Sequence, residues 1–237
     1  MKDKIWTRSP IKFANVTNDN RHFILHPRIA ELVHEYEAKR ILDHGCGDGV
    51  MNLLINDTIE IGLHDINKEI VNVASKNLES YKHNIYYNRN DIPNAYFDVA
   101  ISSNVLMTID NEPEYVNVLL DLKNSVKPNS GRVIIGITHP CFRQYDFSTF
   151  KTEFTNGRSF NYFEEGKKFT VYLKKDNKKN NEYIEFCDFH YSISYTVNKA
   201  LSLGLLLEKM IELPDRSIDQ NFFNFSFAPF LLLIFKV

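Results

Sequence analysis

The feature that most constrains this chain is the segment Arg40-Ile-Leu-Asp-His-Gly-Cys-Gly-Asp-Gly49. Apolar residues run into Asp43, and glycines then follow at positions 45, 47 and 49. A buried strand that ends in a glycine-rich turn and leads into a helix is typical of nucleotide-binding α/β sheets. Glycine permits positive φ angles and lets a ligand approach the backbone closely. We therefore expect a ligand-binding turn here, followed by a helix that begins near Gly49 and includes residues 50–55.

The spacing and the charge of this turn distinguish between two classes of nucleotide ligand. A dinucleotide turn has the spacing G-x-G-x-x-G, whereas here the third glycine comes one residue earlier and position 50 is Val. Asp43 and Asp48 place two carboxylates beside the ligand, and each would repel a bound pyrophosphate by about 1 kcal/mol or more. The turn therefore favours a cationic ligand without phosphate, and S-adenosylmethionine (SAM), with its sulfonium and ammonium groups, has this chemistry.

A second acid follows the next expected strand. Residues 59–64 form a short, largely apolar run that ends at Asp65, twenty residues after Gly45. A carboxylate at the end of the second strand accepts hydrogen bonds from ribose hydroxyls. Because NAD and SAM sites share this feature, Asp65 indicates an adenosine ribose without deciding between the two cofactors.

Together these segments resemble the class I SAM-dependent methyltransferases. The resemblance is carried by the D-x-G-C-G-x-G turn, Asp65, Asn90-Asp-Ile-Pro and Phe97-Asp-Val-Ala-Ile-Ser-Ser-Asn, and it covers roughly residues 25–140. It implies SAM as the cofactor and an α/β, Rossmann-like sheet of seven strands with helices on both faces. Six strands would be parallel, and the last would run antiparallel between the fifth and the sixth.

The resemblance also implies which residues bind the cofactor. Asp91, or the backbone of Ile92, would meet the adenine amino group, although an Asx turn ahead of Pro93 is an alternative reading of Asp91. Cys46 fits the turn as a small side chain rather than as a reactive thiol. The predicted cofactor-binding residues are Asp43, Gly45, Cys46, Gly47, Gly49, Asp65, Ile66, Asp91, Ile92, Ser103 and Asn104.

The sequence predicts a single domain over residues 1–237. Hydrophobic periodicity predicts helices at 28–38, 68–80, 114–123 and 192–203, and further strands at 84–88, 96–102, 132–138, 205–213 and 227–237. Residues 142–182 are rich in Phe and Tyr, lack helical periodicity and predict a cap inserted between core strands five and six. Residues 169–173 and 183–189 alternate as a β-hairpin, with a lysine-rich tip at 174–181. The aromatic cap could be simple core or the wall of an acceptor pocket.

Composition narrows the setting of the protein. A net charge of −2 argues against a large nucleic-acid-binding surface. The three cysteines are scattered without metal-ligand spacing, which predicts neither a disulfide framework nor a zinc site and favours the cytoplasm. The longest apolar stretch, residues 228–235, is too short to span a bilayer and reads as a strand. The oligomeric state cannot be read from the sequence.

The expected chemistry is methyl transfer to a nitrogen, oxygen or carbon atom of a small molecule. An acidic acceptor would gain from a general base, and His139 and His190 follow expected strands, with Tyr191 placed to orient the acceptor. Each histidine could instead have a structural role, and this is also the role expected of His44, within the glycine turn, and His64, within the second strand. No Asn/Asp-Pro-Pro-Tyr signature follows the fourth strand, and no acid triplet resembles a magnesium site. The alternatives are an RNA-modifying methyltransferase and a SAM-binding protein without turnover, whereas Val50 disfavours an NAD-dependent oxidoreductase.

Overall fold

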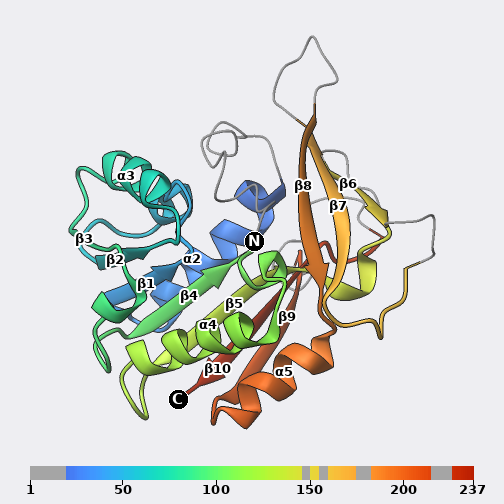
Figure 1. Ribbon diagram of the computed structural model, residues 1–237. Helices are drawn as coiled ribbons and strands as arrows, with labels where there is room; N and C mark the ends of the chain where they lie inside the picture. Colours follow the sequence, from blue (N-terminus) through green and yellow to red (C-terminus); the bar gives the residue numbers. More distant parts are fainter. Residues whose placement is uncertain (1–19, 146–149, 155–159, 175–182, 215–225) are drawn as a thin grey trace.

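A seven-stranded sheet forms the centre of the molecule (Figure 1). The computed structural model describes residues 20–145, 150–154, 160–174, 183–214 and 226–237. The strand order is β3-β2-β1-β4-β5-β10-β9, and β10 runs antiparallel to both of its neighbours while the other pairs are parallel. The predicted architecture is therefore confirmed. The strands are β1 (Arg40–His44), β2 (Glu60–His64), β3 (His83–Tyr86), β4 (Val99–Ser103), β5 (Arg132–Thr138), β9 (Leu206–Leu213) and β10 (Phe230–Lys236).

Helices cover both faces of this sheet because its central strands are apolar on both sides. In β1, Ile41 packs into one core cluster and Leu42 into the other, as the two-residue period of a strand requires. Helices α2 (His26–Glu35) and α3 (Lys68–Asn77) pack on the Ile41 face. Helices α4 (Glu112–Ser125) and α5 (Ile193–Ser202) pack on the Leu42 face.

The helix expected directly after the glycine turn differs from the prediction. It is a single 3-10 segment, η3 (Val50–Leu54), which begins after Gly49 and ends where Ile55 adopts an extended conformation. Only six residues separate Gly49 from the turn at Asn56, so an α-helix of several turns has no room to form. The cavity described below is therefore not built on a long helix N-terminus.

The inserted segment forms a second, three-stranded antiparallel sheet in the order β6-β7-β8. Strands β7 (Lys167–Lys174) and β8 (Tyr183–His190) are the predicted hairpin, and β6 (Phe150–Phe154) adds a third strand that the sequence did not predict. Alternate residues of β7 and β8 bury an apolar cluster. Residues 175–181 of the predicted lysine-rich tip lie outside the described residues.

Candidate functional site

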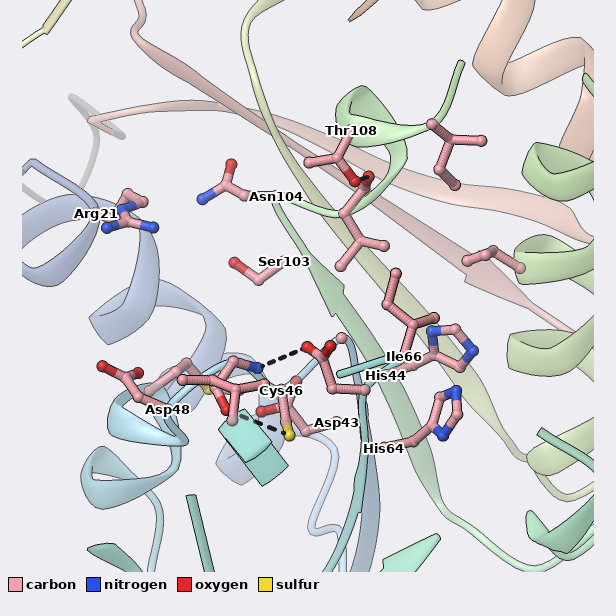
Figure 2. A pocket seen from close by; sticks show the side chains of 18 of the residues that line it. Arg21, Asp43, His44, Cys46, Asp48, His64, Ile66, Ser103, Asn104 and Thr108 are labelled. Atoms are coloured by element: carbon pink, nitrogen blue, oxygen red, sulfur yellow. Dashed lines mark hydrogen bonds between the residues drawn. The ribbon is translucent and has the colours of Figure 1, made fainter. Parts of the chain in front are cut away.

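One cavity opens at the carboxyl ends of β1, β2 and β4, which is where open α/β sheets bind ligands (Figure 2). The glycine turn, the end of β2 and the end of β4 all contribute to its wall. The predicted cofactor-binding residues that line it are Asp43, Gly45, Cys46, Gly47, Asp65, Ile66, Ser103 and Asn104.

Two glycines shape this turn. A side chain would clash at the first, Gly45, and would fill open space beside the second, Gly47. Gly45 has a φ angle of +82°, and a Cβ there would lie 2.2 Å from Val105 Cγ2. Gly47 has a φ angle of +53°, and a Cβ there would meet no atom within 4 Å. Any L-residue would be strained at both positions. The open space beside Gly47 lets a ligand lie directly on the backbone.

Asp65 faces the same turn from the end of β2. Its two carboxylate oxygens accept hydrogen bonds from Gly47 N at 3.1 Å and from Asn67 N at 2.9 Å. Burial raises the pKa of Asp65 despite these bonds. Because each oxygen has a second lone pair, the carboxylate is held in position and still able to accept bonds from ribose hydroxyls.

Asp43 gives the cavity a second buried carboxylate. Its side chain is buried and accepts a hydrogen bond from Asn52 Nδ2 at 2.6 Å. Burial raises the pKa of Asp43 to about 7, and the nearby carboxylates of Asp65 and Asp48 contribute to the increase. A positively charged ligand would favour the ionised form of this group.

The N-terminal part of the described chain contributes a positive charge that the sequence did not assign to a role. Arg21 and His22 come from η2 (Arg21–Leu25), a single π-helical turn ahead of α2, and both line the cavity. Such turns occur frequently at functional sites. In Figure 2, Arg21 and Asp48 lie at one end of the cavity. Burial raises the pKa of Asp48, and the charge of Arg21 partly opposes the increase.

Two histidines lie at the other end of the cavity, close to Ile66 in Figure 2. His44 and His64 end the neighbouring strands β1 and β2, and their ring centroids are 4.7 Å apart. Sequence reasoning gave both a structural role. Their identity as cavity residues follows from the parallel register of β1 and β2, which places the last residues of the two strands side by side.

Buried polar atoms without partners also mark this wall. They are Ser103 Oγ, Asn104 Oδ1, His44 Nδ1 and His64 Nε2, and all four residues line the cavity. Buried polar atoms in folded proteins almost always have a partner. Asn104 has a φ angle of +56°, an uncommon conformation that aims its side chain from the end of β4. The cavity therefore combines a carboxylate suited to a ribose, carboxylates suited to a cation, an arginine and polar atoms without partners. This combination fits the chemical groups of SAM.

Three predicted cofactor-binding residues do not line the cavity. Gly49 packs against α3, where an added Cβ would lie 3.0 Å from Ala74 Cβ. Asp91 instead accepts hydrogen bonds from Asn88 N and Asn88 Nδ2, which forms the capping box of the short 3-10 segment Arg89–Asp91 rather than an Asx turn ahead of Pro93. Ile92 packs against the core on the α4 side of the sheet. Cys46 lies within the turn, and burial raises the pKa of its thiol well above the usual value, which keeps the thiol protonated.

The three predicted catalytic residues are buried, and none of them is among the residues that line the cavity. His139 has both ring nitrogens engaged, Nε2 with Glu212 at 3.0 Å and Nδ1 with Cys141 N at 3.2 Å. His190 Nε2 pairs with the carbonyl oxygen of Tyr162 at 2.9 Å, whereas its Nδ1 has no partner. The Tyr191 hydroxyl donates to the carbonyl oxygen of Ile109, a cavity residue, at 2.9 Å. Burial lowers the pKa of both histidines.

Two further properties concern the described residues only. Among them, no group of three or more His, Cys, Asp or Glu side chains is arranged to hold a metal ion. The helices in this part of the chain are all too short or too polar to cross a membrane.

Several solved structures with a similar fold are methyltransferases. A SAM-dependent methyltransferase from Clostridium acetobutylicum matches with a TM-score of 0.62 and 16% identity over 98% of this chain and 96% of that chain. The CcbJ methyltransferase from Streptomyces caelestis matches with a TM-score of 0.65 and 10% identity over 89% and 94% of the two chains. At such identities these likenesses show the fold.

A third structure was solved with S-adenosylhomocysteine bound. It is the 1,6-didemethyltoxoflavin-N1-methyltransferase from Burkholderia thailandensis, with a TM-score of 0.58 and 11% identity over 98% of this chain and 84% of that chain. A search of curated proteins found no match.

A family model decides the relationship. The model for the methionine biosynthesis protein MetW matches residues 25–145, just over half of the chain, from the start of α2 to the segment after β5. The matched segment contains the glycine turn, Asp65 and the end of β4. SAM is thus the cofactor for which the cavity is built. The chain belongs to the MetW family, among the class I SAM-dependent methyltransferases.

Proposed function

We propose that this protein transfers the methyl group of SAM to a nitrogen, oxygen or carbon atom of a small-molecule acceptor. The observation that carries the proposal is the cavity in which the glycine turn, Asp43 and Asp65 meet the end of β4. Its acidic turn suits a cationic nucleoside, and its opening at the carboxyl ends of the strands leaves room for an acceptor beside it.

When bound, SAM supplies a methyl group that its sulfonium already activates for in-line displacement. The protein's own residues then have to bind the donor and the acceptor, align them with each other and exclude water. Asp65 holds the ribose, and Asp43 and Asp48 provide negative charge around the turn. Arg21, at the far end of the cavity from His64, is a cation for the carboxylate of the amino-acid part.

Of the two proposed bases, His190 has the better arrangement. Its Nε2 must donate to the Tyr162 carbonyl oxygen, so Nδ1 carries the lone pair, and this atom is buried without a partner. Both nitrogens of His139 are already engaged. Tyr191 fixes the position of Ile109, which lines the cavity, and so acts as a positioning residue. A small-molecule acceptor is supported by the near-neutral charge of the chain.

The test of this function combines binding with turnover. Calorimetry should show that SAM and S-adenosylhomocysteine bind the protein and that NADH gives no heat. A metabolite panel incubated with SAM should then release S-adenosylhomocysteine with at least one acceptor. His190→Ala should slow that reaction while leaving cofactor affinity unchanged, whereas His34→Ala, at an exposed position of α2, should change neither. Cofactor binding without turnover on any acceptor would favour a non-catalytic SAM-binding protein. The cytoplasmic location remains a prediction.

A further inference from the structure

The His44–His64 pair at one end of the cavity has two ring nitrogens that no group in the described part of the chain satisfies. Both side chains are almost fully buried, with relative exposures of 2% and 3%. The rings meet at 57° with their centroids 4.7 Å apart. His44 Nδ1 and His64 Nε2 are both buried and have no hydrogen-bond partner. Both residues line the cavity, so a ligand bound there can reach this end.

The protonation of His64 is fixed by its other nitrogen. His64 Nδ1 lies 2.8 Å from the carbonyl oxygen of Tyr86, and a carbonyl only accepts, so Nδ1 carries the proton. Burial and the neighbouring His44 ring lower the pKa of His64 to about 4, so the ring holds a single proton near neutral pH. His64 Nε2 is therefore a bare acceptor in the wall of the cavity.

The same reasoning applies to His44. Its Nε2 lies 3.2 Å from Asp121 Oδ2, a carboxylate oxygen that also accepts from Arg89 Nε at 2.6 Å. Nε2 must donate in this pair, so Nδ1 carries the lone pair when the ring holds a single proton. Arg89 is the nearby cation, but it is held by Asp121 and by Glu114 at 2.7 Å. This part of the wall therefore offers two acceptor nitrogens to a ligand. The N–H groups of the two rings and the guanidinium of Arg89 are bound to other protein groups.

Two ring nitrogens without donors indicate that the ligand carries a hydrogen-bond donor at this end of the cavity. A buried polar atom without a partner is costly, so a donor group on the ligand should bind here with a large preference over an acceptor. His64 is next to Asp65, the ribose anchor, and Ile66 lies close by at this end of the cavity (Figure 2). The positive charge of Arg21 and the acid Asp48 lie at the opposite end. The nucleobase therefore belongs at the histidine end and the amino-acid part at the arginine end.

We propose that His64 Nε2, with His44 Nδ1 beside it, accepts hydrogen bonds from the 6-amino group of the cofactor's adenine and so selects adenine over a 6-oxo purine. The inference rests on the proposed function, because it assumes that SAM occupies this cavity. It assigns the amino group to two residues on β1 and β2. Asp91 and Ile92, which the family resemblance implied for this role, do not line the cavity.

The test compares two ligands that differ at position 6 of the base and in the proton that the 6-oxo base carries on N1. In calorimetry, S-adenosylhomocysteine should bind the wild-type protein at least tenfold more tightly than S-inosylhomocysteine, which has a carbonyl oxygen in place of the amino group. His64→Leu removes one of the two acceptors and should reduce the ratio of the two affinities by at least half. His64→Gln keeps an acceptor oxygen and should retain part of the preference. His34→Ala, at an exposed position of α2, should keep the full ratio.

The outcomes separate this inference from the function on which it rests. If S-adenosylhomocysteine fails to bind the wild-type protein, the proposed function itself is wrong. If it binds but the wild-type protein accepts S-inosylhomocysteine equally well, or if His64→Leu keeps the full preference, the assignment to the histidines is overturned. The wild-type ratio needs no variant, so a folding defect in His64→Leu would still leave a decisive measurement. His44→Leu then provides the second variant, and it should also reduce the ratio.

Discussion

At the scale of single residues, the cavity depends on carboxylates that hydrogen bonds hold in place. Asp65 accepts one hydrogen bond from the glycine turn and one from the start of α3, so the two loops that flank the cavity are joined through this side chain. Asp43 lies on the neighbouring strand β1 and is held by Asn52 of η3. A carboxylate with backbone donors is already oriented before a ligand arrives, which reduces the ordering cost of binding.

Asp65→Ala should weaken the binding of S-adenosylhomocysteine by at least about tenfold, because it removes charge-assisted hydrogen bonds to the ribose. Titration calorimetry of the two proteins measures the ratio directly. Asp57→Ala, at an exposed turn between η3 and β2, is the matched control and should bind like the wild type. An unchanged affinity in Asp65→Ala would discredit the ribose assignment, provided that thermal unfolding shows the variant to be folded.

At the scale of elements, β10 joins the edge strand β9 to the rest of the sheet. It lies between β5 and β9, and its residues from Phe230 to Phe235 are all buried. Leu232→Ala should lower the free energy of unfolding by about 2–5 kcal/mol, because Leu232 is fully buried and a cavity would remain. Leu206→Ala, at the start of the neighbouring strand β9, should change it by less than about 0.5 kcal/mol, because Leu206 is 61% exposed. Urea unfolding of both variants tests the contrast, and equal losses would contradict it.

Local sequence signals predicted the elements that depend on local pattern. The bounds of β5 were predicted to the residue, because a turn with Pro and Gly precedes the apolar run from Arg132 to Thr138. Strand β6 was missed because Phe150–Phe154 is a short edge strand within an aromatic segment that has no clear period. The segment after the glycine turn was predicted as a helix and is only the 3-10 segment η3. The glycine spacing indicates where a helix begins, but it does not indicate where the helix ends.

The residues of the candidate site also fall into two groups: those that local spacing predicts and those that depend on distant parts of the chain. Gly45, Gly47 and Asp65 could be predicted because their spacing along the chain fixes their place in the turn and at the end of β2. Arg21 could not be assigned, because its entry into the cavity depends on how η2 packs against the rest of the fold. The roles of His44 and His64 depend on partners as distant in sequence as Asp121, 77 residues from His44.

At the scale of the whole molecule, the cap sheet joins the main sheet through buried charges. Asp188 of β8 is fully buried, and neither of its carboxylate oxygens has a hydrogen-bond partner. Arg143, which follows β5, is also buried and donates to the Thr138 hydroxyl, and its guanidinium lies 5.2 Å from the centre of the Phe169 ring of β7. Charge and burial at this junction should therefore make the stability of the fold depend on pH.

Burial raises the pKa of Asp188 to about 7, although the charges of Arg143 and Arg21 partly oppose the increase. The unfolded chain should titrate this group near 3.9, so between about pH 4 and 7 the folded state binds more protons and the free energy of unfolding falls as pH rises. Asp188→Asn removes that titration, so its stability relative to the wild type should increase across this range by about 1–4 kcal/mol. Urea unfolding at pH 4.5, 6 and 7.5 measures the change. Glu185→Gln, on the exposed face of β8, should follow the wild-type curve in parallel. A difference between Asp188→Asn and the wild type that stays constant with pH would show that Asp188 ionises normally in the folded protein.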